Sequence, residues 1–221
     1  MKNFILFDFD GVIADTFTPA FEVQKMMCPK ATADDYRARF EGNINDTYKQ
    51  GNYHTDECFH DIDFFAEYIP RFKKQGKVFV GMTEAIKQLS KNYSLIIVSS
   101  TITSPIQDFL VKNNLASYFF EVMGNDVHTS KVEKIKMIFS KYNTTTKNCV
   151  FVTDTLGDML EAEKTGVAAI GVTWGFHGEE RLARGKPFMI VNTPEELLKS
   201  ISNFYNDSGL VHETKPVSMK S

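Results

Sequence analysis

The sequence predicts an α/β protein with a doubly wound parallel sheet and a smaller, all-helical domain inserted after the first strand. From about residue 81 onward, short apolar runs alternate with helical segments, which is typical of a parallel sheet covered by helices. Residues 17–79, between the first strand and the second, contain no convincing strand and are too many for a simple crossover. Several of the apolar runs end in polar side chains, which indicates a site at one edge of the sheet.

The first strand is expected at Phe4–Phe7, four apolar residues in a row that suit burial on both faces of a sheet. Asp8, Asp10 and Gly11 follow directly. Two carboxylates this close repel each other, and the repulsion grows in a low-dielectric crevice, so a divalent cation would stabilise them. The simpler alternative is a strand end that dips into solvent, with Gly11 making the turn.

The inserted residues are expected to form several helices. One covers about 19–27, a second starts near the capping box that begins at Thr32, and a third covers about 56–72. The third carries an apolar stripe at spacings of three and four, formed by Cys58, Ile62, Phe65, Ile69 and Phe72. Pro70 should kink or end this helix. We expect residues 17–79 to form a cap domain that is joined to the core through linkers near 15–18 and 76–81.

The rest of the chain is expected to complete the α/β core, which would comprise residues 1–16 and 80–205. Further strands are predicted at 93–98, 119–123, 149–153, 168–173 and 188–191. Helices are predicted at 83–91, from the N-cap Ser104, at 131–142 after Ser130, at 155–164, and from Thr193 to about Tyr205. Residues 206–221 are polar without periodicity and are expected to be a mobile tail.

Composition limits the class of protein. The chain has 221 residues and a formal net charge of −3, which gives no electrostatic reason to expect binding to nucleic acid or to an anionic membrane. The early aspartates interrupt any signal peptide, and no apolar run reaches transmembrane length. Cys28, Cys58 and Cys149 are few and widely spaced, and we expect them to be reduced, buried thiols. A cytoplasmic protein, monomeric or weakly dimeric, is therefore expected.

Polar residues follow three of the later apolar runs or begin the next helix. The hydroxyls of Ser99 and Ser100, with the backbone N–H groups beyond them, could hold a phosphate oxygen, or the two serines could simply turn the chain. Lys131 lies in the first turn of a helix, where a cation opposes the helix dipole. It therefore indicates an anion site, the alternative being a solvated surface lysine. Asp154 ends a strand and Asp158 follows one turn later, where it could instead serve a capping box.

These motifs together resemble those of the haloacid dehalogenase-like hydrolases. Residues 8–16 resemble the first signature of that superfamily, and Ser99 stands where its second motif requires serine or threonine. Lys131 matches the third motif and residues 153–158 match the fourth. Within the superfamily, the chain is most similar to the branch with a helical cap, which includes phosphoglycolate-phosphatase-like and β-phosphoglucomutase-like members. The family often has glycine where Thr153 stands here, and the sequence does not explain this departure.

The resemblance implies roles for these residues. Asp8 would be the nucleophile that forms an aspartyl-phosphate, and Asp10 would protonate the leaving oxygen and then activate water. Ser99 and Lys131, with Ser100 nearby, would bind the phosphoryl oxygens. Mg²⁺ would be held by Asp8, the backbone carbonyl of Asp10 and Asp154, because oxygen ligands suit this ion. Asp158 would lie next to the metal ligands without binding the ion itself.

The function implied is a Mg²⁺-dependent phosphatase that acts on a small phosphorylated metabolite. A phosphomutase, which passes the phosphoryl group to a sugar, is the first alternative. A non-catalytic binding module is disfavoured because Asp8, Asp10 and Lys131 are all present. Asp10 also favours phosphoryl transfer over dehalogenation, which has no alkoxide to protonate. Phosphonate cleavage would need a cap lysine, for which Lys25, Lys30 and Lys49 are candidates by composition only.

The sequence does not identify the substrate. Six residues could contact it, although each is more simply interpreted as a surface or packing residue: Arg37, Arg39, Lys49, His54, Trp174 and His177.

Overall fold

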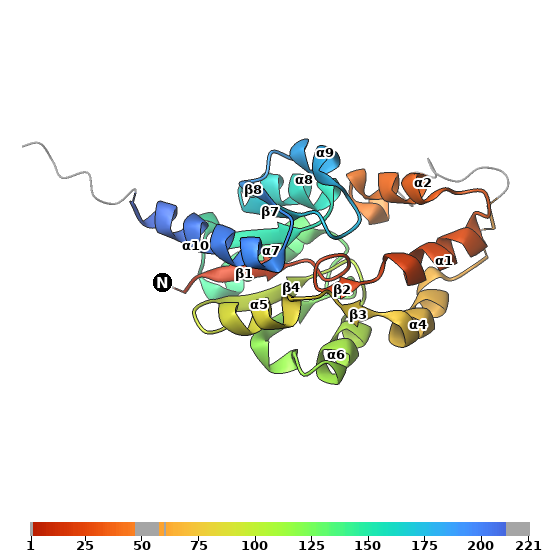
Figure 1. The fold of residues 1–221 in the computed structure, drawn as a ribbon, viewed down its shortest axis with the longest axis horizontal. Helices are drawn as coiled ribbons and strands as arrows, with labels where there is room; N and C mark the ends of the chain where they lie inside the picture. Colours follow the sequence, from red (N-terminus) through yellow and green to blue (C-terminus); the bar gives the residue numbers. More distant parts are fainter. Residues whose placement is uncertain (1, 47–57, 60, 211–221) are drawn as a thin grey trace, which may run out of the picture.

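The centre of the protein is a six-stranded parallel sheet with the order β5-β4-β1-β6-β7-β8 (Figure 1). The computed structural model describes residues 2–46, 58–59 and 61–210. The sheet strands are β1 Phe4–Phe7, β4 Ser94–Val98, β5 Phe119–Met123, β6 Cys149–Thr153, β7 Ala168–Val172 and β8 Met189–Val191. The predicted doubly wound α/β fold is confirmed, and every predicted strand of the sheet lies within one residue of its expected bounds.

The first strand lies in the middle of the sheet. Phe7 is in register with Ile97 of β4 on one side and with Val152 of β6 on the other. The carboxyl ends of these three parallel strands therefore lie level with one another, on both sides of β1. The order of strands along the chain reverses at β1, with β4 and β5 on one side and β6, β7 and β8 on the other. In an open α/β sheet such a reversal opens a crevice for a ligand, and Asp8 is the first residue beyond β1.

Helices cover both faces of the sheet (Figure 1). Alternate residues of β1 point to opposite faces: Ile5 and Phe7 pack in the same core as α5, α6 and α10, and Phe4 and Leu6 pack in the core formed with α7, α8 and α9. The helices are α5 Met82–Leu89, α6 Thr103–Lys112, α7 Lys131–Tyr142, α8 Leu156–Thr165, α9 Glu179–Ala183 and α10 Pro194–Leu210, with short 3₁₀ turns η2 Ala116–Tyr118 and η3 Thr146–Asn148.

Residues 17–79 are called the inserted segment below, and its described parts lie beyond the carboxyl end of β1 (Figure 1). Its described elements are α1 Phe17–Met27, α2 Ala33–Ala38, the 3₁₀ turn η1 Arg39–Glu41, α4 Phe64–Gln75 and β3 Lys77–Val78. β3 pairs antiparallel with β2 Ala14–Asp15, so the segment leaves and rejoins the core through a small two-stranded sheet. The sequence predicted plain linkers at both places. That the segment acts as a separate cap domain stays a prediction.

Two helices, α4 of the inserted segment and α10 of the core, end later in the sequence than predicted. α4 begins after Asp63, whose carboxylate accepts hydrogen bonds from the N–H groups of Phe65 and Ala66. The helix does not end at Pro70 but continues to Gln75. Part of the predicted range before Asp63 lies outside the described residues. α10 likewise runs to Leu210, beyond the predicted end near Tyr205. Residues 206–210 of the expected mobile tail are therefore helical, and residues 211–221 lie outside the described residues.

The start of α6 was predicted wrongly. Ser104 lies inside this helix, and the N-cap is Ile102, whose side chain makes no capping bond. A residue from a distant loop takes that role, because Asp126 Oδ1 accepts hydrogen bonds from both N and Oγ1 of Thr103. A cap supplied across 23 residues of chain has no local sequence signature.

The prediction of three reduced cysteines is wrong for two of them. Cys28, at the end of α1, forms a disulfide with Cys58, and only Cys149 is a free, buried thiol. The pair is separated by 30 residues, so no short motif could reveal it, and it closes because the inserted segment folds back on itself.

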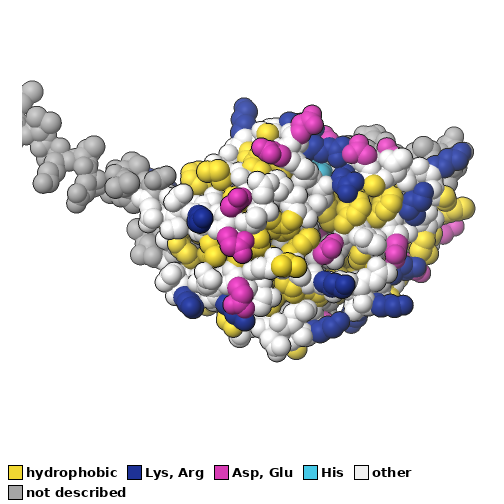
Figure 2. All heavy atoms as spheres, viewed as in Figure 1, with side chains coloured by type: hydrophobic (Ala, Val, Ile, Leu, Met, Phe, Trp, Pro, Cys, Tyr) yellow, Lys and Arg dark blue, Asp and Glu magenta, His cyan; other side chains and the backbone are white. Residues whose placement is uncertain are grey.

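The surface carries charges of both signs. On the face drawn in Figure 2, basic and acidic side chains are interspersed over the helices. Within residues 2–46, 58–59 and 61–210, no helix is both long and apolar enough to cross a membrane.

Candidate active site

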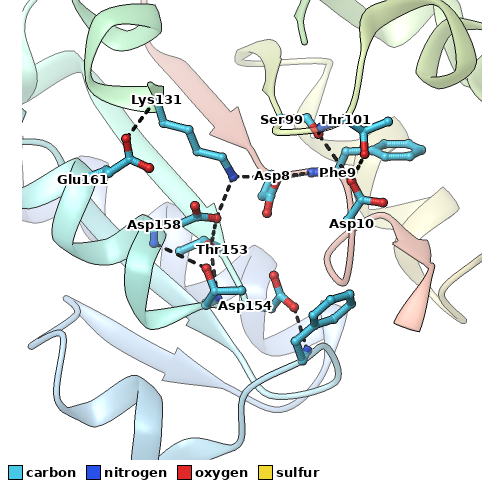
Figure 3. Close-up of polar contacts among 12 residues, drawn as sticks. Asp8, Phe9, Asp10, Ser99, Thr101, Lys131, Thr153, Asp154, Asp158 and Glu161 are labelled. Carbon is cyan, nitrogen blue, oxygen red and sulfur yellow. Dashed lines mark hydrogen bonds and ion pairs between the residues drawn. The ribbon is translucent and has the colours of Figure 1, made fainter. Parts of the chain in front are cut away.

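A buried lysine contacts two carboxylates, one just beyond β1 and one in the first turn of α8. Lys131 is the first residue of α7, and its Nζ lies 2.9 Å from Asp8 Oδ1 and 2.7 Å from Asp158 Oδ2 (Figure 3). All three side chains are almost inaccessible to solvent. The structure thus brings together three of the predicted site residues, from the end of β1, the start of α7 and the first turn of α8.

Thr153, where the family often has glycine, holds Asp158. Its Oγ1 donates a hydrogen bond of 2.8 Å to Asp158 Oδ2 and accepts one from the N–H of Thr155. Thr155 Oγ1 accepts from the N–H of Asp158 and so caps α8, but the reciprocal bond of the predicted capping box is not made, because the N–H of Thr155 donates to Thr153 instead. Asp158 is therefore fixed by its own helix and by Thr153, and its carboxylate faces Lys131.

Asp154 is the first residue after β6 and lies close to the loop that follows β1. Its Oδ2 accepts a hydrogen bond of 2.7 Å from the N–H of Phe176, and its buried Oδ1 has no hydrogen-bond partner. Gly11 has a φ of +75°, and a Cβ there would lie 2.0 Å from Asp154 Oδ2. Only glycine lets the loop turn left-handed and pass this close to the carboxylate.

The buried charges at this site do not balance. Asp8, Asp154 and Asp158 are three carboxylates, and among the described residues Lys131 is the one ammonium group that forms ion pairs with two of them. Burial raises the pKa of Asp154 to about 8 and the pKa of Asp8 well above its usual range, although Lys131 opposes the latter. Burial also disfavours ionised Asp158, but Lys131 and hydrogen bonds hold its pKa below the ordinary value.

The pKa of Lys131 is raised. Burial would lower it, but the neighbouring carboxylates of Asp158 and Asp8 stabilise the charged ammonium by a larger amount. Lys131 therefore stays protonated, and it can balance only one of the three carboxylates. Asp8 and Asp154 would both be ionised only beside a second cation.

The chemistry of these side chains fits a magnesium ion. The unpartnered, buried Oδ1 of Asp154 is the observation that points to a cation site, because a buried carboxylate oxygen without a partner is unfavourable. No group of three or more acidic, histidine or cysteine side chains in the described parts of the chain forms a preformed metal cage. Mg²⁺ commonly uses one or two carboxylates and completes its shell with water and substrate oxygens.

Asp10 lies beside this group and is held by hydroxyls. Tyr68, from α4 of the inserted segment, donates a hydrogen bond of 2.8 Å to Asp10 Oδ1. Thr101 Oγ1 donates one of 2.8 Å to Oδ2, and Ser99 Oγ lies 3.4 Å from the same oxygen (Figure 3). Sequence reasoning missed Tyr68 and Thr101. The sequence signal for Tyr68 is its position three residues after Phe65, which places its hydroxyl-bearing ring next to the apolar stripe of the same helix.

Ser99 is fully buried, and its contacts lie within the protein. Its Oγ accepts from the N–H of Thr101, and its carbonyl accepts a hydrogen bond of 2.6 Å from Lys134 Nζ. Burial lowers the pKa of Lys134 to about 8. Ser100 lines the cavity of the site. That Ser99 binds a phosphoryl oxygen stays a prediction.

A cavity of about 240 Å³ connects these groups to the inserted segment. Asp8, Asp10, Ser100, Lys131 and Asp158 line it from the core. Its other walls come largely from apolar and aromatic side chains of α1, α2, η1 and α4, together with Phe176. Glu161, another residue that sequence reasoning missed, also lines it and accepts hydrogen bonds from the N–H of Lys131 and the hydroxyl of Ser130.

The residues considered as possible substrate contacts have structural roles where the structure describes them. Arg37 lies over the ring of Phe17, and Arg39 is buried and donates to Gln24. Trp174 Nε1 donates to the carbonyl of Val12.

His177 joins α8 to the inserted segment. Its Nδ1 accepts from the N–H of Leu156, and its Nε2 donates to the carbonyl of Arg37. Lys49 and His54 lie outside the described residues. Lys25 and Lys30 do not line the cavity.

Comparison with known proteins agrees with this fold. The family model described as haloacid dehalogenase-like hydrolase matches residues 5–172, and the chain belongs to this family. A protein of Dickeya dadantii named "Probable phosphatase IndB" is 28% identical over 213 residues, which cover 90% of this chain and 93% of the relative. The phosphoglycolate phosphatase of Synechococcus elongatus is 22% identical, with 90% of this chain and 96% of the relative covered.

A solved structure of a predicted phosphatase from Clostridium acetobutylicum has the same fold. It is similar with a TM-score of 0.74 at 22% identity, and the match covers 92% of this chain and 99% of that one. The chain is therefore a hydrolase of this family, and phosphatase is the class that its named relatives indicate.

Proposed function

We propose that the protein is a Mg²⁺-dependent phosphatase that hydrolyses a small phosphate monoester through an aspartyl-phosphate at Asp8. The observation that carries this proposal is the position of Lys131 Nζ, within 3 Å of both Asp8 and Asp158, with Asp10 two residues beyond Asp8. A nucleophile, an acid–base group and a cation thus meet at the carboxyl end of β1.

Asp8 is the proposed nucleophile. Its Oδ1 accepts hydrogen bonds from the N–H of Phe9 at 2.7 Å and from Lys131, so we assign attack to Oδ2. A bond forms between this oxygen and phosphorus as the bond from phosphorus to the leaving oxygen breaks. Lys131 reduces the repulsion between the carboxylate and the dianionic ester.

Asp10 is the proposed acid–base group. It gives a proton to the leaving oxygen in the first half of the reaction. In the second half it takes a proton from the water that attacks phosphorus, which frees Asp8 and releases phosphate. Hydroxyl groups can rotate, so Tyr68 and Thr101 can hold either protonation state of Asp10 in place.

Asp8, Asp154 and the backbone carbonyl of Asp10 would hold the magnesium ion. When bound, it would neutralise charge on the phosphoryl oxygens and on the attacking carboxylate. The buried Oδ1 of Asp154 supports this assignment because a cation would give it the partner that the protein does not.

The test is phosphate release from a panel of esters, with and without Mg²⁺. Inorganic phosphate is the expected product, and an isomerised sugar phosphate would instead indicate a phosphomutase. Beryllofluoride with Mg²⁺, which mimics the aspartyl-phosphate, should raise the melting temperature by ligand linkage. An unchanged melting temperature at saturating reagent would contradict the proposed arrangement.

A further inference from the structure

The cavity of about 240 Å³ has two chemically different ends. Asp8, Asp10 and Lys131 line the charged end, where the proposed function places the phosphoryl group. The inserted segment supplies an apolar wall, which includes Met27, Tyr36, Phe40, Ile44, Phe64 and Phe65. Because the phosphoryl group occupies the charged end, the leaving group of the ester must lie against this wall.

Aromatic rings from two parts of the inserted segment form most of the wall. Phe40 of η1 contacts Tyr36 of α2 and Phe176, with ring centroids 5.3 and 5.0 Å away and the rings nearly perpendicular. Phe64 and Phe65 belong to α4. In Figure 1, α2 and α4 lie on either side of α1. Rings held by one another in this way present fixed faces and edges, which are complementary to another ring.

The phosphoryl end does not favour a second anionic group. Among the described residues that line the cavity, Lys131 is the only cationic side chain, and it is already paired with Asp8 and Asp158. Glu161 adds a further carboxyl group to the lining. Among the described residues, a carboxylate on the leaving group would therefore lie beside carboxylates and aromatic rings and would have no cation of its own.

The size of the cavity limits the leaving group. A dry apolar cavity of about 150 Å³ is large enough to bind benzene. At about 240 Å³, the cavity has room for a phosphoryl group and about one ring.

We propose that the preferred substrate is a phosphate monoester of an uncharged alcohol that carries one apolar, planar ring. This inference rests on the proposed function and adds the class of leaving group to it. It also distinguishes the chain from relatives named for phosphoglycolate, whose leaving group is an anionic two-carbon acid.

The test compares benzyl phosphate, ethyl phosphate and 2-phosphoglycolate at saturating Mg²⁺. All three are alkyl esters that need a proton on the leaving oxygen, so differences in kcat/KM report recognition of the leaving group. Benzyl against ethyl phosphate isolates the ring, and 2-phosphoglycolate against ethyl phosphate isolates the charge. We expect kcat/KM for benzyl phosphate to exceed that for ethyl phosphate by about 10- to 100-fold. We expect 2-phosphoglycolate to be the poorest of the three.

A matched pair of variants links this preference to the wall. Phe65→Ala should reduce kcat/KM for benzyl phosphate by about tenfold and leave ethyl phosphate within about threefold. Phe59→Ala removes a phenylalanine of the same segment that is 59% exposed and does not line the cavity, and it should change neither value.

The outcomes separate this inference from the proposed function. Hydrolysis of the esters with 2-phosphoglycolate preferred, or with no gain from the ring, would overturn the inference and leave the phosphatase proposal standing. No release of phosphate from any ester would overturn both. A loss of the ring preference in Phe65→Ala alone would support the wall as its source.

Discussion

The strand ends of the sheet and the apolar wall of the inserted segment hold their side chains in different ways. At the strand ends, Lys131, Asp8 and Asp158 are fixed by ion pairs and hydrogen bonds below 3 Å. In the wall, Tyr36 and Phe40 are fixed by ring packing, with centroids more than 5 Å apart. The polar network suits a phosphoryl group that every substrate of this class shares. The apolar wall suits only some leaving groups, so under the proposed function reaction and selectivity would have separate structural origins.

The two regions meet at Asp10. Its two carboxylate oxygens accept hydrogen bonds from opposite sides, one from Thr101 of the core and one from Tyr68 of the inserted segment. The proposed acid–base group is thus oriented partly by the region that contacts the leaving group. At this one residue, reaction and selectivity would therefore not be fully separate. The effects of variants on kcat and on KM can measure how far the two are coupled.

The largest effect is expected from Asp8→Asn, which should lower kcat by more than about a thousandfold for every ester because it removes the nucleophile. Its folded state should survive, since the change removes one carboxylate from a site with excess negative charge. The measurements are phosphate release and the melting temperature, with exposed Asp61→Asn as the control. Appreciable turnover by purified Asp8→Asn would exclude Asp8 as the nucleophile.

Removal of Mg²⁺ should have the next largest effect. A chelator should lower kcat for all esters by about a hundredfold or more, and added Mg²⁺ should restore it. Asp154→Asn should weaken Mg²⁺ binding measured by calorimetry, because Asp154 Oδ1 would lose its charge. Full activity in the chelator, or unchanged Mg²⁺ affinity in this variant, would contradict the assignment of the metal site.

Tyr68→Phe should have a smaller effect that falls on catalysis. Without its hydroxyl, Asp10 loses the donor to Oδ1, and kcat should fall by about tenfold with a shifted pH–rate profile. KM for an apolar ester should change little because the ring remains. The control is Tyr118→Phe, on η2 before the start of β5. If kcat and its pH profile are unchanged in Tyr68→Phe, the inserted segment does not orient Asp10.

The smallest effect is expected on stability, at the contact that His177 makes between the regions. Burial lowers the pKa of His177 below its usual value of 6.5, so the folded state holds the neutral imidazole. The stability that this residue contributes should be complete above pH 6.5 and should fall at lower pH, by at most about 1.4 kcal/mol per pH unit. His177→Gln lacks this titration.

The measurement is the free energy of unfolding of wild type and His177→Gln in urea at pH 7.5 and pH 5.5. The difference between the two proteins should narrow at the lower pH, because His177 of the unfolded chain takes up a proton there while the folded state keeps the neutral imidazole, whose Nδ1 accepts from the N–H of Leu156. A difference that stays constant or widens would show that His177 does not titrate in this way.

The same contrast explains what the sequence could predict. Asp8 and Asp154 directly follow strands with strong local patterns, and Lys131 begins a helix with a clear cap. Their position at one edge of the sheet therefore follows from topology. Asp158 lies in the first turn of α8, as the sequence predicted, but its bond to Thr153 depends on side-chain geometry. The sheet and its order of elements were predicted for the same reason, since apolar runs and caps are local.

Features made by distant residues could not be predicted. Tyr68 reaches Asp10 across 58 residues, and the disulfide of Cys28 with Cys58 spans 30. The pairing of β2 with β3 involves two residues from each strand, too few for a pattern. The aromatic wall is assembled from separate helices and the turn η1, and only the segment that forms α4 shows an apolar stripe in the sequence.

The most direct test of the separation between reaction and selectivity is an exchange of the inserted segment. Residues between Phe17 and Phe79 would be replaced by the matching segment of a relative, and kcat/KM would be measured for benzyl phosphate, 2-phosphoglycolate and p-nitrophenyl phosphate. The ranking of the first two should change to that of the donor, while p-nitrophenyl phosphate should be hydrolysed within about tenfold of the parent rate. A folded chimera that keeps the parent's ranking would contradict the account and place selectivity in the core loops.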